Sequence, residues 1–181
     1  MKELSLNVLD IIENSINAKA KNIHIVVNED DSVDLLEIII KDDGVGMDDE
    51  FLKTVCDPFT TSSTNKKVGL GLPLLKQEAE LTSGGLRIKS KKGIGTEVQV
   101  SFKKSCVDTP PLGDLVSTII CVFATHPEVN LYYKHTVNGK TFEISTDLIR
   151  KECGDNYCNP VILKGIKEFF QNSIESLYGG E

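Results

Sequence analysis

The first apolar positions of the chain recur at helical spacing over residues 3–20, so one face of a helix should pack on a core. These positions are Leu4, Val8, Leu9, Ile12 and Ile16. Polar side chains fall on another face of this helix at i, i+3, i+4 and i+7, and they are Asp10, Glu13, Asn14 and Asn17. Two carboxylates and two amides therefore form one stripe along the predicted helix.

Apolar runs after this helix predict a β-sheet. The predicted strands lie at residues 23–27, 35–40, 86–89 and 96–102. The second strand runs directly into a turn with two glycines at residues 41–47. A further helix is predicted from Pro73 to Thr82, because proline suits a first helical turn and Gly84 suits a C-terminal stop.

The second half of the chain has its own pattern of helix, hairpin and helix. Its first helix is marked by Leu112, Leu115, Val116, Ile119, Ile120 and Phe123. Asn138-Gly139 is a strong two-residue hairpin signal between strands predicted at residues 129–137 and 141–145. A last amphipathic helix begins near Pro160.

These elements divide the chain into two parts. Residues 1–104 hold every feature that points to chemistry, and residues 105–181 form a small C-terminal segment of unknown role, without a catalytic constellation. A length of 181 residues suits one domain, or one domain with a small appendage.

Composition and charge narrow the classes of function. Hydrophobic residues at 40% and charged residues at 26% are typical of a soluble globular protein. The net charge of -7 argues against nonspecific nucleic-acid binding, which needs cationic side chains at phosphates. No apolar run reaches the ~18 residues of a spanning helix, and no signal peptide is recognisable. We therefore expect a cytoplasmic protein that binds neither nucleic acid nor membrane.

Five cysteines are scattered along the chain without a regular framework, which favours free or buried thiols. Cys153 and Cys158, with His126 and His135 nearby in sequence, leave a metal site as the alternative. No pair among them has the close spacing of a zinc motif.

A candidate ligand-binding turn follows the second predicted strand, where Asp43 precedes Gly44 and Gly46. Glycines permit a tight turn and close approach of the backbone, and a carboxylate held there can accept a hydrogen bond from an exocyclic amine. Taken alone, such a Gly-x-Gly is more often an ordinary turn.

A candidate phosphate site lies at Gly69 and Gly71, before the helix that starts at Pro73. Backbone N–H groups and the positive end of a helix bind anions. The preceding residues 60–67 are too polar to be ordered by burial and predict a mobile loop. The polar stripe of the first helix offers oxygen ligands for magnesium. Each feature also fits a solvated surface, but their order along the chain is far more specific.

In this order the features resemble the GHKL superfamily of ATP-binding proteins, which includes gyrase, heat-shock chaperones, histidine kinases and MutL. Residues 10–18 look like the N box, and Asn14 falls on the position whose amide oxygen binds magnesium. Asp43 with its two glycines looks like the G1 box, with Asp43 on the adenine amine. Thr96 corresponds to a threonine that contacts adenine.

The resemblance extends to the phosphate side of the family's site. Residues 57–61 look like the F box of histidine kinases, and Gly69 and Gly71 look like the G2 glycines at the triphosphate. Lys66 or Lys67, near the end of the intervening ATP lid, could then reach a phosphate.

The resemblance implies an α+β fold, an α/β sandwich of the Bergerat type with helices on one face of a mixed, mostly antiparallel sheet. It implies ATP and Mg²⁺ as cofactors. The implied nucleotide-binding residues are Asn14, Asp43, Gly44, Gly46, Met47, Phe59, Thr60, Lys66, Lys67, Gly69, Leu70, Gly71, Leu72 and Thr96.

The implied catalytic residue is Asp10, and it departs from the family pattern. Members that hydrolyse ATP carry a glutamate there, whereas the aspartate is one methylene shorter. A misplacement of ~1 Å can cost on the order of 10²-fold in rate, so we expect slow hydrolysis at best. Asn17 also replaces the usual aspartate of the MutL-like box.

Three activities remain open at this point. The first is a stand-alone protein kinase that resembles the anti-sigma-factor serine kinases, the second a slow ATPase that acts on a partner, and the third a noncatalytic ATP sensor. An autonomous sensor histidine kinase is not expected, because only two residues precede the first predicted helix. We expect a protein partner or phosphoacceptor, and a homodimer remains open.

Overall fold

The computed structural model describes residues 3–56 and 71–179. Its helices are α1 (Leu4–Asn17), α2 (Asp49–Thr54), α3 (Gly71–Leu81), α4 (Leu115–Thr125), α5 (Thr146–Cys153) and α6 (Pro160–Leu177), with the 3-10 helix η2 (Asp155–Cys158). Its strands are β1 (Asn22–Asp30), β2 (Leu35–Asp42), β3 (Gly85–Lys91), β4 (Gly95–Lys103), β5 (Asn130–Val137) and β6 (Lys140–Ser145). Each helix and strand predicted above is present, with bounds that differ by a few residues.

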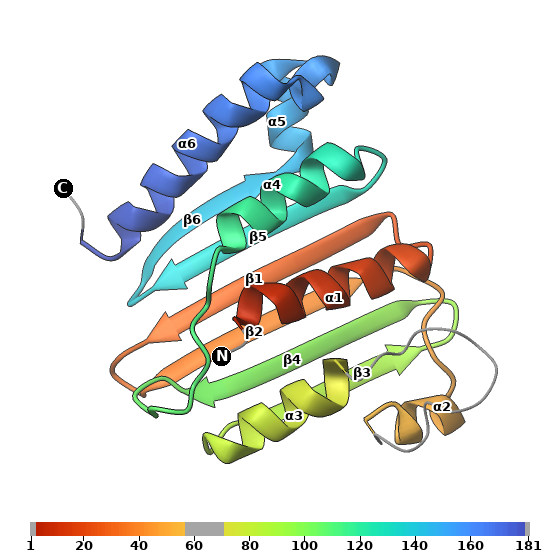
Figure 1. Ribbon diagram of the computed structural model, residues 1–181. Coiled ribbons are helices and arrows are strands. Elements are labelled where there is room, and N and C mark those ends of the chain that lie inside the picture. The colour runs from red at the N-terminus through yellow and green to blue at the C-terminus, as the bar shows by residue number, and fades with distance from the viewer. Residues whose placement is uncertain (1–2, 57–70, 180–181) are drawn as a thin grey trace.

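Within the described residues the strands form one sheet in the order β3-β4-β2-β1-β5-β6. The β1–β5 pair is parallel, and the four other neighbouring pairs are antiparallel. Helices α1, α3, α4 and α6 cover one face of this sheet (Figure 1). The predicted α/β sandwich on a mixed, mostly antiparallel sheet is therefore confirmed.

Strict alternation along the central strands decides which side chains reach the core. On β2, Leu36, Ile38 and Ile40 are buried under the helices, while the residues between them lie on the open face. The next inward position on this strand is Asp42, at its C-terminal end. The sheet thus directs a carboxylate toward the helical layer at the point where the apolar core ends.

The C-terminal segment continues the sheet and the core of the first part. Strand β5 runs parallel to β1, from the pair Asn22–Asn130 to the pair Glu29–Val137. Phe123 of α4 and Phe170 of α6 belong to the same buried cluster as the apolar residues of α1 and β1. Residues 105–179, predicted as an appendage, therefore share one hydrophobic core with the residues before them.

A buried polar network also joins the two parts. The Glu29 carboxylate, 5% exposed, contacts Nε2 of His135 at 3.0 Å, Nζ of Lys104 at 3.0 Å and the hydroxyl of Tyr178. The Nδ1 atom of His135 contacts the Tyr133 hydroxyl at 3.0 Å, which fits an imidazole that accepts on Nδ1 and donates from Nε2. Burial alone raises the pKa of Glu29, but hydrogen bonds from His135, Tyr178 and Lys104 lower it to about 2.

Helices α2 and α5 were not predicted from the sequence, because both are too short to show a helical period. Helix α2 has six residues and begins with a side-chain cap, in which the N–H of Phe51 donates to Oδ1 of Asp48 at 2.8 Å. Helix α5 follows β6 without a linker, and the hydroxyl of Ser145 caps it by accepting from the N–H of Leu148 at 3.2 Å.

Candidate functional site

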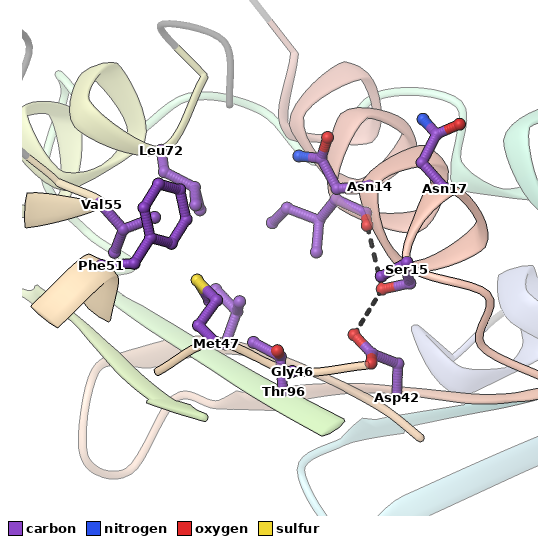
Figure 2. A pocket seen from close by; sticks show the side chains of 13 residues that line it. Asn14, Ser15, Asn17, Asp42, Gly46, Met47, Phe51, Val55, Leu72 and Thr96 are labelled. Carbon is purple, nitrogen blue, oxygen red and sulfur yellow. Dashed lines mark hydrogen bonds between the residues drawn. The ribbon is translucent and has the colours of Figure 1, made fainter. Parts of the chain in front are cut away.

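A cavity of about 450 Å³ opens between α1, the C-terminal end of β2 and the beginning of β4. Helix α2 and the first turn of α3 form its other wall (Figure 2). The side chains that line it are Ile11, Asn14, Ser15, Asn17, Ala18, Asp42, Gly46, Met47, Phe51, Val55, Leu72, Thr96 and Val98. Its volume is in the range of small-molecule sites, ~300–1,000 Å³, and its lining is mostly apolar with a few convergent polar groups.

Among the described residues that line the cavity, Asp42 carries the one carboxylate, and two protein donors hold it. The Ser15 hydroxyl donates to Oδ2 at 2.7 Å, and the N–H of Gly44 donates to Oδ1 at 2.8 Å. Figure 2 shows Asp42 at the floor of the cavity, below Ser15 of α1. An oriented acceptor in an apolar cleft can select a ligand that presents a donor at that point.

The prediction that Asp43 is the carboxylate of this site is wrong. Its side chain points away from the cavity and accepts hydrogen bonds from the N–H of Lys21 at 2.8 Å and from the N–H and Nδ2 of Asn22 at 2.9 and 2.7 Å. The physical reason is the strand period: Asp42 continues the inward positions of β2, so the next residue must face outward. From Asp42 the residues read Asp-x-Gly-x-Gly and include Gly44 and Gly46, whereas Asp43 directly precedes Gly44.

Both predicted glycines close the turn behind this carboxylate. A Cβ on Gly44 would lie 2.8 Å from the carbonyl oxygen of Ala18, so only glycine lets the turn approach the end of α1. Gly46 has φ +66°, and a Cβ there would lie 2.1 Å from the carbonyl oxygen of Lys91. Gly46 lines the cavity, whereas Gly44 acts through its N–H on Asp42.

Four further predicted residues line the cavity: Asn14, Met47, Leu72 and Thr96. The Ser90 hydroxyl ties two of them together, because it accepts from the N–H of Met47 at 2.8 Å and lies 2.8 Å from Oγ1 of Thr96. Asn14 extends from α1 toward the space between α1 and α3 (Figure 2). The predicted stripe on the first helix therefore faces the cavity at Asn14 and Asn17.

Asp10 lies one turn before Asn14 and is not among the residues that line the cavity. Its carboxylate Oδ2 lies 3.4 Å from the position of a Cβ on Gly71, the first residue of α3. Asp10 and Gly71 are therefore neighbours at the junction of α1 and α3. The predicted residues Phe59, Thr60, Lys66, Lys67, Gly69 and Leu70 lie outside the described residues.

Sequence reasoning missed several cavity residues: Ile11, Ser15, Ala18, Asp42, Phe51, Val55 and Val98. The alternation along β2 carried the signal for Asp42, and the helical period places Ser15 one turn after Ile11, on the buried face of α1. Phe51 and Val55 belong to the α2 region, whose shortness left no pattern to interpret.

Comparison with known proteins identifies the family. Residues 2–105, more than half of the chain, match the model of the histidine kinase-, DNA gyrase B- and HSP90-like ATPase family. The chain belongs to this family. The match includes α1, the Asp42 turn and Thr96, and thus every part of the cavity described above.

Among its relatives are bacterial kinases. Sporulation kinase C of Bacillus subtilis is 35% identical over 92 residues, covering 51% of this chain and 21% of that protein. Histidine protein kinase DivJ of Caulobacter vibrioides is 30% identical over 97 residues, covering 51% of this chain and 16% of that protein. The chain therefore spans about a fifth or less of the length of these relatives.

A solved structure shares the fold over a longer stretch. The N-terminal domain of a DNA repair protein superposes with a TM-score of 0.58 at 16% identity, covering 80% of this chain and 52% of that chain. At this identity the likeness shows the fold alone.

The residues present fit the nucleotide that the family binds. Asp42 and Thr96 offer polar groups between apolar walls, and Asn14 offers an amide oxygen to the same cavity. Among residues 3–56 and 71–179, no group of three or more His, Cys, Asp or Glu side chains could hold a metal ion. No helix in that part of the chain has the length and apolar content to cross a membrane.

Proposed function

We propose that this protein binds Mg-ATP in the cavity between α1 and β2 and uses it to act on a partner protein, as a stand-alone kinase or a slow ATPase. The observation that carries the proposal is the Asp42 carboxylate, fixed by Ser15 and Gly44 at the floor of an apolar cleft. A carboxylate has about four lone-pair sites, and two of them are used by the protein. The remaining ones can accept from the exocyclic amine of adenine.

The triphosphate would extend from the base toward Asn14 and the first turn of α3. The N-terminus of that 11-residue helix presents backbone N–H groups and a partial positive charge, which favour an anion. Asp10 lies beside this helix start and is the candidate to orient an attacking water or hydroxyl group. ATP supplies the phosphoryl group when bound, and the protein's side chains position it.

The alternative is a noncatalytic ATP sensor. The names of the relatives, a sporulation kinase and a histidine protein kinase, favour transfer over sensing. Incubation of the purified protein with γ-labelled ATP, alone and with cell extract, separates the activities. Label on a partner protein indicates a kinase and free phosphate indicates an ATPase, whereas neither product contradicts both and leaves the sensor.

Asn14 and Asp10 should separate binding from chemistry, because they lie one turn apart on α1 and only Asn14 lines the cavity. Asn14→Ala should lower the affinity for ATP in magnesium by about tenfold, or about 1.4 kcal/mol, and lower turnover with it. Asp10→Ala should leave the affinity unchanged and lower turnover alone. Titration calorimetry with a phosphate-release assay measures both quantities.

Asn7→Ala is the matched control, since Asn7 is an amide on the same helix whose side chain contacts Glu78 outside the cavity. It should change neither affinity nor turnover. Loss of ATP affinity in Asp10→Ala, or normal turnover in that variant, would remove Asp10 from the catalytic role.

A further inference from the structure

The C-terminal segment is connected to the turn beside the cavity by a series of hydrogen-bonded polar side chains at one end of the sheet. Arg150 of α5 donates from Nη1 to Oδ1 of Asn130 at 3.0 Å, and Nδ2 of Asn130 donates to Oδ1 of Asn22 at 3.2 Å. Nδ2 of Asn22 then donates to Oδ2 of Asp43 at 2.7 Å. The series crosses from α5 over the first residues of β5 and β1 to the turn that holds Asp42.

Figure 1 shows why these residues can meet. Strands β5 and β1 are parallel neighbours, so both begin at the same end of the sheet, and α5 lies at that end. Asn22 and Asn130 are direct partners in the β1–β5 register. Both side chains lie on the open face, because the next residue of each strand, Ile23 or Leu131, is buried under the helices.

The hydrogen bonds between these four side chains all run in the same donor-to-acceptor direction. A guanidinium donates at one end, a carboxylate accepts at the other, and each amide between them accepts with its oxygen and donates with its nitrogen. Such an arrangement aligns the amide dipoles between a cation and an anion, and each bond polarises the next. An asparagine is the side chain that provides both functions at each intermediate position.

Further contacts fix both ends of this series of hydrogen bonds, Arg150 and Asp43. The Arg150 guanidinium also donates from Nη2 to the carbonyl of Pro127, lies 3.6 Å from Oδ1 of Asp147 and has its Cζ 6.0 Å from the centre of the Tyr157 ring. At the other end, although burial raises the pKa of Asp43, hydrogen bonds from Asn22 and Lys21 hold it below its usual range. Neither end can move without breaking several contacts.

Asp43 transmits this arrangement to the cavity because it directly follows Asp42. The two carboxylates point in opposite directions from consecutive residues, one into the cavity and one onto the beginning of β1. The turn between them and α1 is also closed by the N–H of Val45, which donates to the carbonyl of Ala18 at 2.8 Å. Displacement of Asp43 therefore displaces the carboxylate that faces the ligand.

We propose that Arg150 and Asn130 are positioning residues of the nucleotide site, which act through Asn22 and Asp43 on the orientation of Asp42. The C-terminal segment, which lies beyond the residues that match the family, is then a structural component of the site. The expected effect of Arg150 and Asn130 on ATP affinity rests on the proposed function. Their expected effect on the Asp42 turn does not depend on any nucleotide.

The test compares two asparagines that face the same side of the sheet. Asn130→Leu keeps the branching and the number of heavy atoms of the side chain and removes both of its hydrogen bonds in this series. Asn28→Leu is the matched control, because Nδ2 of Asn28 donates to Oε2 of Glu37 at 3.1 Å, an amide–carboxylate bond toward the far end of β1. Amide hydrogen exchange, measured by NMR without nucleotide, should become faster at Gly44 and Val45 in Asn130→Leu and remain unchanged there in Asn28→Leu.

The same two variants give a second measurement with ATP. The affinity of Asn130→Leu for Mg-ATP should fall by about fivefold, the lower end of typical couplings between sites, while that of Asn28→Leu should match the wild type. If Asn130→Leu does not fold, Asn130→Asp replaces it, since that variant keeps an acceptor for Arg150 and loses the donor to Asn22.

The exchange measurement distinguishes failure of this inference from failure of the proposed function. Unchanged exchange at Gly44 and Val45 in the Asn130 variant overturns the positioning role, whatever the ATP affinity. Faster exchange in a protein whose wild type binds no ATP supports the positioning role and contradicts only the nucleotide assignment.

Discussion

Replacing Asp42 with asparagine is expected to lower the affinity for ATP by about 30- to 150-fold. A hydrogen bond to a charged group contributes about 2–3 kcal/mol when the alternative is an unpaired group in an apolar cleft. The asparagine keeps the shape of the side chain. Its amide nitrogen, however, puts a donor where the aspartate has an acceptor, and a donor cannot accept a hydrogen bond from the adenine amine. Titration calorimetry of both proteins with ATP in magnesium measures the loss.

Asp43→Asn is the matched control for this experiment. Asp43 accepts its hydrogen bonds from protein groups, so its variant should lose far less affinity and should keep the wild-type ratio of ATP to GTP affinity. Asp42→Asn should reduce that ratio, since Asp42 lines the cavity and is the residue that we propose to face the base. A larger loss in Asp43→Asn than in Asp42→Asn would restore the original sequence-based assignment.

The second large effect concerns stability, at the end of β1 opposite the cavity. Glu29→Gln should lower the free energy of unfolding by about 3 kcal/mol at pH 7, because it removes a buried charge that Lys104, His135 and Tyr178 surround. Urea unfolding followed by circular dichroism measures the loss. Glu37→Gln is the control, since Glu37 accepts hydrogen bonds from Asn28 and Gln99 on the open face. This variant should lower the free energy of unfolding by well under half as much as Glu29→Gln.

The same carboxylate predicts a pH dependence with a definite sign. The pKa of Glu29 is about 2 in the folded protein and 4.5 as its ordinary value, so the folded state binds this proton less readily than the unfolded state. Its stabilisation is therefore fully present above about pH 4.5 and is lost as the pH falls toward 2. The stabilities of wild type and Glu29→Gln should converge over this interval. A difference that stays constant down to pH 2.5 would contradict the network.

Most of the fold could be predicted from the sequence because its elements carry strong periods. The apolar face of α1, the alternation of β1 and β2 and the Asn138-Gly139 hairpin each follow from local chemistry. The joining of β5 to β1 could not be predicted in this way. Nothing local in either strand specifies a partner across about a hundred residues, and the pairing arises from a shared core and the Glu29 network.

The site residues that local motifs contain could likewise be predicted, whereas contacts between distant segments could not. Asn14, Gly46, Met47, Leu72 and Thr96, which were predicted to bind the nucleotide, line one cavity, because motif order predicts which loops and helices converge. Asp42 was missed through a shift of one residue, although the inward positions of β2 pointed to it. The hydrogen-bonded series from Arg150 to Asp43 joins a helix, two strands and the turn after β2, and no spacing along the sequence predicts it.

Titration calorimetry of the wild-type protein with Mg-ATP and Mg-GTP is the decisive test of adenine binding at Asp42. We expect saturable binding of one ATP per chain and at least tenfold weaker binding of GTP, since guanine would present a carbonyl oxygen to Asp42 where adenine presents its amine. Equal affinities for the two nucleotides, or no heat of binding with ATP, would contradict the assignment of the cavity.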